Sequence, residues 1–133
     1  MTNRDVYEAA LALLAEEREE LCGDYETRAP YLLAAFINES REVNTFYRMM
    51  NGDDDANLDV GAAVDLDADF PLEDRFCPVG AYYLAALLIE PEDEVLSDRL
   101  FAHYADALAC VSRGIPVEKE TIRDAYGFRY SED

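Results

Sequence analysis

Three aspartates, Asp65, Asp67 and Asp69, occupy alternating positions, as do the first three ligands of an EF-hand loop that binds Ca²⁺. The rest of that loop is missing. Phe70 stands where the sharp turn requires glycine, and Phe76 stands where a bidentate glutamate completes the coordination. The pattern therefore predicts no metal site. We assign the three aspartates instead to contact with a protein partner.

His103 is the single histidine, so a catalytic dyad needs the thiol of Cys22, Cys77 or Cys110 beside it. Cys110 follows on the same predicted helix, but their spacing places the two about 10 Å apart along the helix axis, beyond hydrogen-bond reach. We interpret the histidine as a neighbour of an apolar stripe and the cysteines as small packing residues. No glycine-rich phosphate loop, GxSxG, HExxH or CxxC pattern occurs. The sequence predicts neither an enzyme nor a cofactor.

The chain is strongly acidic, with 30 acids against 11 bases and a formal charge of −19. Such a charge repels the phosphate backbone of nucleic acid, so direct nucleic-acid binding is not expected. The acidity is compatible with plain solubility, with a basic partner surface, with cation binding, or with mimicry of DNA. Charge alone does not separate these interpretations.

A chain of 133 residues, half of them hydrophobic, is long enough to form one domain with a core of its own. The three cysteines are an odd set, which fits a reducing compartment better than a disulfide framework. The longest apolar run, residues 81–89, is about half of what a bilayer-spanning helix needs. We therefore expect a cytoplasmic protein without membrane contact.

Apolar spacing and capping residues predict four helices, at about residues 3–22, 27–51, 74–90 and 91–113. Thr27 is predicted to cap the second helix with Pro30 in its first turn, and Pro91 is predicted to open the fourth. The third helix is apolar on nearly every side, which predicts a central position. The expected fold is all-α, with a single domain at 1–114 that resembles a four-helix bundle.

Two segments lie outside these helices. Residues 52–73 form a long acidic loop without a single base, and its few apolar residues predict either a short strand near 60–70 or an extended segment across the bundle. Residues 115–133 form a C-terminal tail that is too apolar to be merely solvated. Its candidate partner-binding residues are Ile115, Val117, Ile122, Tyr126, Phe128 and Tyr130.

Three stretches taken together resemble a group of small helical proteins that tailed phages and prophages encode beside the portal gene, the head-to-tail connector or adaptor type. The first is YETRAPYLLAAF at 25–36, which opens the second helix. The second, at 70–104, places an acidic linker before an apolar YYLAA helix and a further helix with an aromatic residue near its middle. The third is IRDAYGF at 122–128, which is similar to a short C-terminal tag.

This resemblance implies a small α-bundle that assembles as a ring on a portal protein and contacts its neighbours through loops and tails. On this chain those contact regions correspond to the acidic loop and the tail, and the protein would be virion-associated. The leading expectation is therefore a non-enzymatic structural assembly protein that binds a portal-like protein or a second copy of itself. The alternative is an acidic inhibitor or DNA mimic that occupies a basic groove on another protein.

Overall fold

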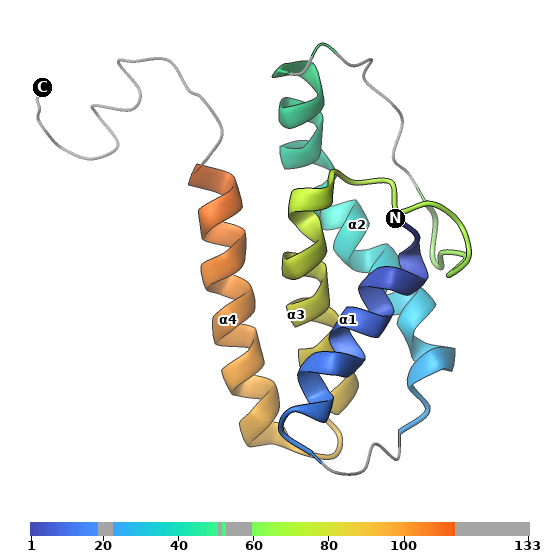
Figure 1. The fold of residues 1–133 in the computed structure, drawn as a ribbon, viewed down its shortest axis with the longest axis vertical. Coiled ribbons are helices and arrows are strands. Elements are labelled where there is room, and N and C mark those ends of the chain that lie inside the picture. The colour runs from blue at the N-terminus through green and yellow to red at the C-terminus, as the bar shows by residue number, and fades with distance from the viewer. Residues whose placement is uncertain (19–22, 51, 53–59, 114–133) are drawn as a thin grey trace, which may run out of the picture.

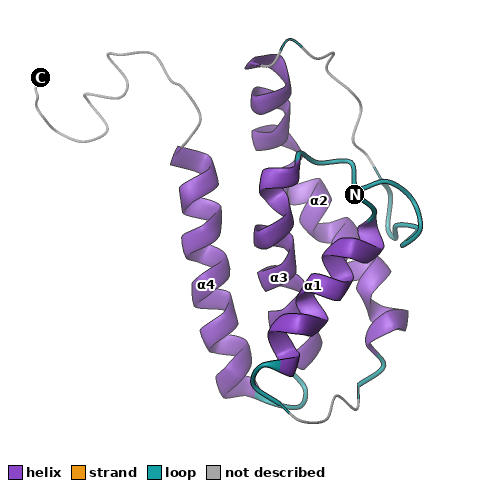
Figure 2. Cartoon of the chain, viewed as in Figure 1, coloured by secondary structure: helices purple, strands orange, loops and turns teal. Residues whose placement is uncertain are grey.

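The computed structural model describes residues 1–18, 23–50, 52 and 60–113 of the chain. These residues form four α-helices and one short 3₁₀ helix, η1, with no strand among them (Figure 1 and Figure 2). The prediction of an all-α domain that resembles a four-helix bundle is confirmed. In chain order the elements are α1 (Asn3–Ala15), α2 (Tyr25–Met50), η1 (Asp74–Phe76), α3 (Cys77–Ile89) and α4 (Glu94–Arg113).

The apolar helix α3 lies at the centre of the domain, as its sequence predicted. It packs against α1, α2 and α4, and most extensively against α4. Figure 1 shows α3 with α4 on one side and with α1 and α2 on the other. The buried residues of α3 are Val79, Gly80, Ala81, Leu84, Ala85, Ala86, Leu88 and Ile89.

None of the helices in the described ranges is long and apolar enough to cross a bilayer.

Gly80 is the point on α3 where α1 and α2 both approach closely. A Cβ atom at this position would lie 2.9 Å from Cε2 of Phe36 on α2 and 3.3 Å from Cγ1 of Val6 on α1. Both neighbouring side chains are fully buried, so neither has free space into which to move. The absence of a side chain at Gly80 therefore lets three helices meet.

Replacing Gly80 by valine is expected to lower the free energy of unfolding by about 2 kcal/mol, because the added carbons overpack the site. Urea denaturation followed by circular dichroism measures the change. The matched control is Ala102→Val at an exposed position on α4, where the expected change is within about 0.5 kcal/mol. An unchanged denaturation midpoint for Gly80→Val would mean that the three helices do not meet closely at this residue.

The first helix ends earlier than its predicted limit at residue 22. Helix α1 stops at Ala15, and the N–H groups of Glu17 and Arg18 both donate to the carbonyl of Leu14 in a closing turn. Two acids, Glu16 and Glu17, stand at this end, where the negative pole of the helix dipole disfavours them. The predicted continuation over 19–22 lies outside the described residues.

The start of the second helix also differs from the prediction. Helix α2 begins at Tyr25 rather than after a Thr27 cap, so Pro30 lies inside the helix instead of in its first turn. Proline has no N–H to donate to the carbonyl of Glu26, four residues earlier, and Glu26 is exposed, so water can reach that end of the helix. The carbonyl of Pro30 accepts a hydrogen bond from the N–H of Val64 at 3.1 Å. The acidic loop therefore contacts α2 where proline interrupts the helical pattern.

The predicted third and fourth helices begin too early. Residues 74–76 form the 3₁₀ helix η1 before α3 starts, and Pro91 belongs to the turn between α3 and α4 rather than to α4. Asp93 provides the physical reason, since its carboxylate accepts the N–H of Leu96 at 3.0 Å and caps α4. An N-cap aspartate therefore sets the start of α4 in place of the proline.

The turn between α3 and α4 is tied to the start of α2. The hydroxyl of Tyr25 donates to the Glu92 carboxylate at 2.6 Å, and burial together with this acidic neighbour raises the pKa of Tyr25 to about 12. The guanidinium of Arg28 donates to the carbonyls of Leu87 and Leu88 at 2.8 and 3.1 Å. These carbonyls belong to the last turn of α3, where helical acceptors lack partners within the helix. Arg28 therefore closes the C-terminal end of the central helix.

Candidate protein-binding surfaces

The described run of the acidic loop, residues 60–73, packs along the start of α1. The first N–H groups of a helix have no partner within it. Here the loop supplies the partners, since the N–H of Asn3 donates to the carbonyl of Ala68 at 2.9 Å. The N–H of Arg4 likewise donates to the carbonyl of Leu66 at 2.7 Å. This part of the loop is therefore a structured cap on α1.

The same segment is held against the rest of the domain. Besides the bond from Val64 to Pro30, the N–H of Glu73 donates to the side-chain oxygen of the buried Asn44 on α2 at 2.8 Å. Its conformation is neither of the two forms that the sequence allowed. Turns at 61–62 and 66–67 interrupt any extended run, and among the described residues its β pairing is limited to one isolated bridge. Its apolar side chains reach the core at Leu66, Phe70 and Leu72.

The three aspartates singled out in the sequence have different surroundings. The Asp65 carboxylate accepts the backbone N–H of Asp67 at 2.9 Å, and the Asp67 carboxylate pairs with Nε of Arg4 at 3.0 Å. Asp69 forms the isolated bridge with Thr2. All three are exposed, and no group of three or more metal-ligating side chains comes together in the ranges that the structure describes. The arrangement is an exposed acidic edge on a fixed backbone.

The predicted tail residues Ile115, Val117, Ile122, Tyr126, Phe128 and Tyr130 lie outside the described residues. The point where the tail begins is nevertheless defined. Helix α4 ends at Arg113, and the hydroxyl of Tyr47 on α2 donates to the carbonyl of Val111 in the last turn of α4. The tail therefore starts beside the C-terminal end of α2.

An exposed apolar surface at this end of α2 was not predicted from the sequence. The side chains of Phe46, Met49 and Met50 are 51–61% exposed. The three are spaced at i, i+3 and i+4, so they share one side of α2. We call them the α2 patch. The signal in the sequence was the length of α2, whose 26 residues exceed what the 13 residues of α3 can cover.

Charges of both signs lie at this end of the molecule. Arg41 and Arg48 lie on α2, but the helical period places them on the opposite side of the helix from Phe46 and Met50. The guanidinium of Arg75 lies over the ring of Tyr47, 3.7 Å from its centroid, and also pairs with Glu73 at 3.3 Å. The α2 patch is therefore an apolar surface without a surrounding group of basic residues on its own helix.

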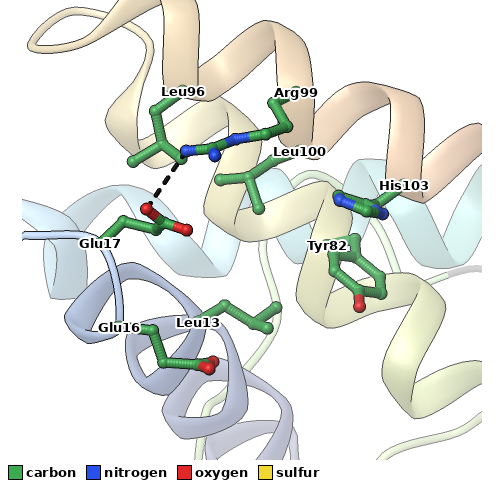
Figure 3. Close-up of a pocket in the computed structure, with 8 residues that line it drawn as sticks. All are labelled: Leu13, Glu16, Glu17, Tyr82, Leu96, Arg99, Leu100 and His103. Carbon is green, nitrogen blue, oxygen red and sulfur yellow. Dashed lines mark ion pairs between the residues drawn. The ribbon is translucent and has the colours of Figure 1, made fainter.

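A small pocket of about 160 Å³ lies between α1, α3 and α4 (Figure 3). Arg99 and Glu17 form an ion pair beside it at 3.3 Å, and the His103 imidazole stacks on the ring of Tyr82 with 5.4 Å between centroids. Both members of the ion pair are about half exposed, so it contributes little to stability. The other lining residues are Leu13, Glu16, Leu96 and Leu100. His103 therefore stacks on the ring of Tyr82, beside the apolar side chains Leu13, Leu96 and Leu100 that line the pocket.

Comparison of the chain with protein-family models, with curated proteins and with solved structures finds no match. A functional assignment therefore depends on the chemistry of its own residues and on their arrangement. Two surfaces stand out in the described structure, the exposed acidic edge at Asp65, Asp67 and Asp69 and the α2 patch. The tail begins beside the second of these.

Proposed function

We propose that the chain is a non-enzymatic assembly protein of the head-to-tail connector type found in tailed phages and prophages. On this proposal it binds a portal-like protein or a neighbouring copy of itself, and the helical domain is the scaffold. The resemblance at 25–36, 70–104 and 122–128 supports this assignment. The first two stretches correspond in the folded chain to the start of α2 and to the run from the acidic loop through α3 into α4.

The observation that carries the proposal is that the described residues form a buried core of their own. Within the described ranges the buried apolar residues lie between Val6 and Leu100, and they include the large side chains of Phe36, Phe76 and Leu84. The tail adds six more large apolar residues, and exposing them to water is unfavourable. A partner that buries these side chains stabilises the complex by removing apolar surface from water. Extended segments commonly bind neighbouring proteins in this way.

The acidic edge is the second surface that suits this function. Asp65, Asp67 and Asp69 are exposed while the backbone that carries them is hydrogen-bonded to α1, so binding requires little further ordering of that backbone. An acidic edge favours a basic partner through charge complementarity. In a ring of identical copies the charge of −19 on each chain opposes assembly, so the contacts between copies must overcome that repulsion.

Truncation after Gly114 tests the proposal. We expect the shortened chain to keep the helical circular dichroism and the denaturation midpoint of the full chain, because the buried apolar residues of the described structure lie within 6–100. Light scattering after size exclusion should show that the full chain associates and that the truncated chain has the mass of one copy. Rings of the full chain are expected in negative-stain electron microscopy.

The salt dependence of association separates the proposal from its alternative. Salt screens repulsion between copies of charge −19, so self-association through apolar contacts should strengthen as ionic strength rises. An inhibitor or DNA mimic would instead bind a basic protein more weakly in salt. Loss of helical structure on truncation, or a full chain that stays monomeric, would overturn the proposal.

A further inference from the structure

The α2 patch is an unpartnered surface at the end of the longest helix. Figure 1 shows the last turns of α2 rising past the start of α3, with α4 set to one side. Six large apolar side chains are strongly exposed in the described part of the chain, and three of them, Phe46, Met49 and Met50, fall within five consecutive residues. Methionine side chains are unbranched and adapt to irregular partners, so such a surface suits an extended segment with several apolar residues.

The α2 patch offers a partner apolar contact and little opposite charge. The described residues at this end include Arg75 and Arg113 and the acids Glu42, Glu73 and Asp74, and Arg75 already pairs with Glu73 at 3.3 Å. Burial of Phe46, Met49 and Met50 is therefore what a partner at this surface gains.

We propose that the α2 patch receives the C-terminal segment, residues 114–133, of a second copy of the chain. This inference rests on the proposed function and names the surface to which the tail binds. The segment contains 20 residues and can reach about 65 Å when extended. Because it starts beside the α2 end of its own copy, it can span to the patch of a neighbour.

The composition of the segment matches the apolar patch. Its six apolar residues, Ile115, Val117, Ile122, Tyr126, Phe128 and Tyr130, supply the groups that cover Phe46, Met49 and Met50. Its five acids are partly offset by the bases Lys119, Arg123 and Arg129, so the segment carries much less charge than the whole chain. Each copy offers one tail and one patch, so the contact is head to tail and leads to a ring or to an open chain of copies.

The test is a full-length triple variant, Phe46→Ser with Met49→Ser and Met50→Ser, measured by light scattering after size exclusion. The mass is expected to fall from that of the assembly to that of one 15.0 kDa chain. All three side chains are about half exposed or more, so the helical circular dichroism should be unchanged. The control is Val95→Ser, whose side chain is 80% exposed at the other end of the domain and whose loss should leave the assembly intact.

Mixing two deficient chains makes the test specific for tail and patch. The chain truncated after Gly114 keeps its patch, and the triple variant keeps its tail. Each alone is expected to be a monomer, and together they should form a one-to-one complex that grows no further. A mixture that stays monomeric would overturn the inference, because the patch would then act in some contact other than with the tail.

The outcomes also separate this inference from the proposed function. If truncation abolishes association while the triple variant assembles normally, the tail binds another surface and the inference is wrong, although the proposed function stands. If truncation leaves the assembly unchanged, the proposed function itself fails.

Discussion

Phe36→Ala is expected to lower the free energy of unfolding by about 3–5 kcal/mol, a large share of the stability of a small domain. Phe36 is fully buried, and its ring lies 5.5 Å from that of Tyr83 on α3 and 6.4 Å from that of Tyr104 on α4. It also fills the space that Gly80 leaves on α3. Truncation removes apolar burial and two aromatic contacts and leaves a cavity where three helices meet.

Urea denaturation followed by circular dichroism measures this loss. Small domains are stable by only about 5–15 kcal/mol, so the Phe36→Ala variant should unfold at much lower urea concentrations than the parent chain. Tyr31→Ala is the control, since it removes an aromatic ring at a position that is 60% exposed on the same helix and lies outside the α2 patch. Equal shifts of the two midpoints would contradict the burial of Phe36 between the helices.

Arg28→Met is expected to lower the free energy of unfolding by about 2–3 kcal/mol, because it removes two charge-assisted hydrogen bonds and leaves carbonyls of α3 without partners. The guanidinium donates to Leu87 and Leu88, the first partly buried and the second fully buried. Helix α3 has no base in its own last turn, so Arg28 also supplies the positive charge that the end of the helix dipole favours. Methionine keeps most of the volume of the side-chain stem.

Two variants make the Arg28 measurement decisive. Arg28→Lys retains the charge but loses the planar fork that binds two carbonyls, so its denaturation midpoint should fall between those of the parent and Arg28→Met. Arg41→Met makes the same change at an exposed position on the same helix and should shift the midpoint little. A loss for Arg41→Met as large as that for Arg28→Met would mean that general charge, and not the closure of α3, explains the effect.

The central position of α3 was predictable because it depends on residue type alone. A helix that is apolar on every side is stable in water only when other elements surround it, and α1, α2 and α4 do so. The N-cap at Thr2 was also predictable, since its hydroxyl accepts the N–H of Asp5 and the Asp5 carboxylate accepts the N–H of Thr2 in return. Both features use residues that are neighbours in the chain.

The incorrect predictions concern choices between several suitable residues. Thr27 and Pro91 are both acceptable near a helix start, yet α2 starts before the first and α4 starts after the second. Asp93 prevails over Pro91 because its carboxylate both caps α4 and pairs with Arg18 at 3.2 Å. The second of these contacts joins residues 75 positions apart, so no local pattern reveals it.

The two candidate surfaces also combine features that the sequence predicts with features that depend on contacts between distant residues. The exposure of Asp65, Asp67 and Asp69 follows from their charge, but their fixed backbone follows from the pairing of the loop with Asn3 and Arg4 at the start of α1. The exposure of the α2 patch was not predicted from the sequence. The patch becomes a surface because α2 extends beyond its neighbours, which depends on where α3 begins.

Periodicity, composition and charge were enough to predict an acidic all-α protein with an apolar central helix, an acidic loop and an apolar tail, because these are properties of residue type and of neighbouring residues. Only the folded chain shows that the described part of the acidic loop caps α1, that Arg28 closes the end of α3, and that Phe46, Met49 and Met50 are exposed at the end of α2. Each of these depends on contacts, or on missing contacts, between residues far apart in the chain. Such contacts are set by how the helices pack, and packing is a property of the whole core.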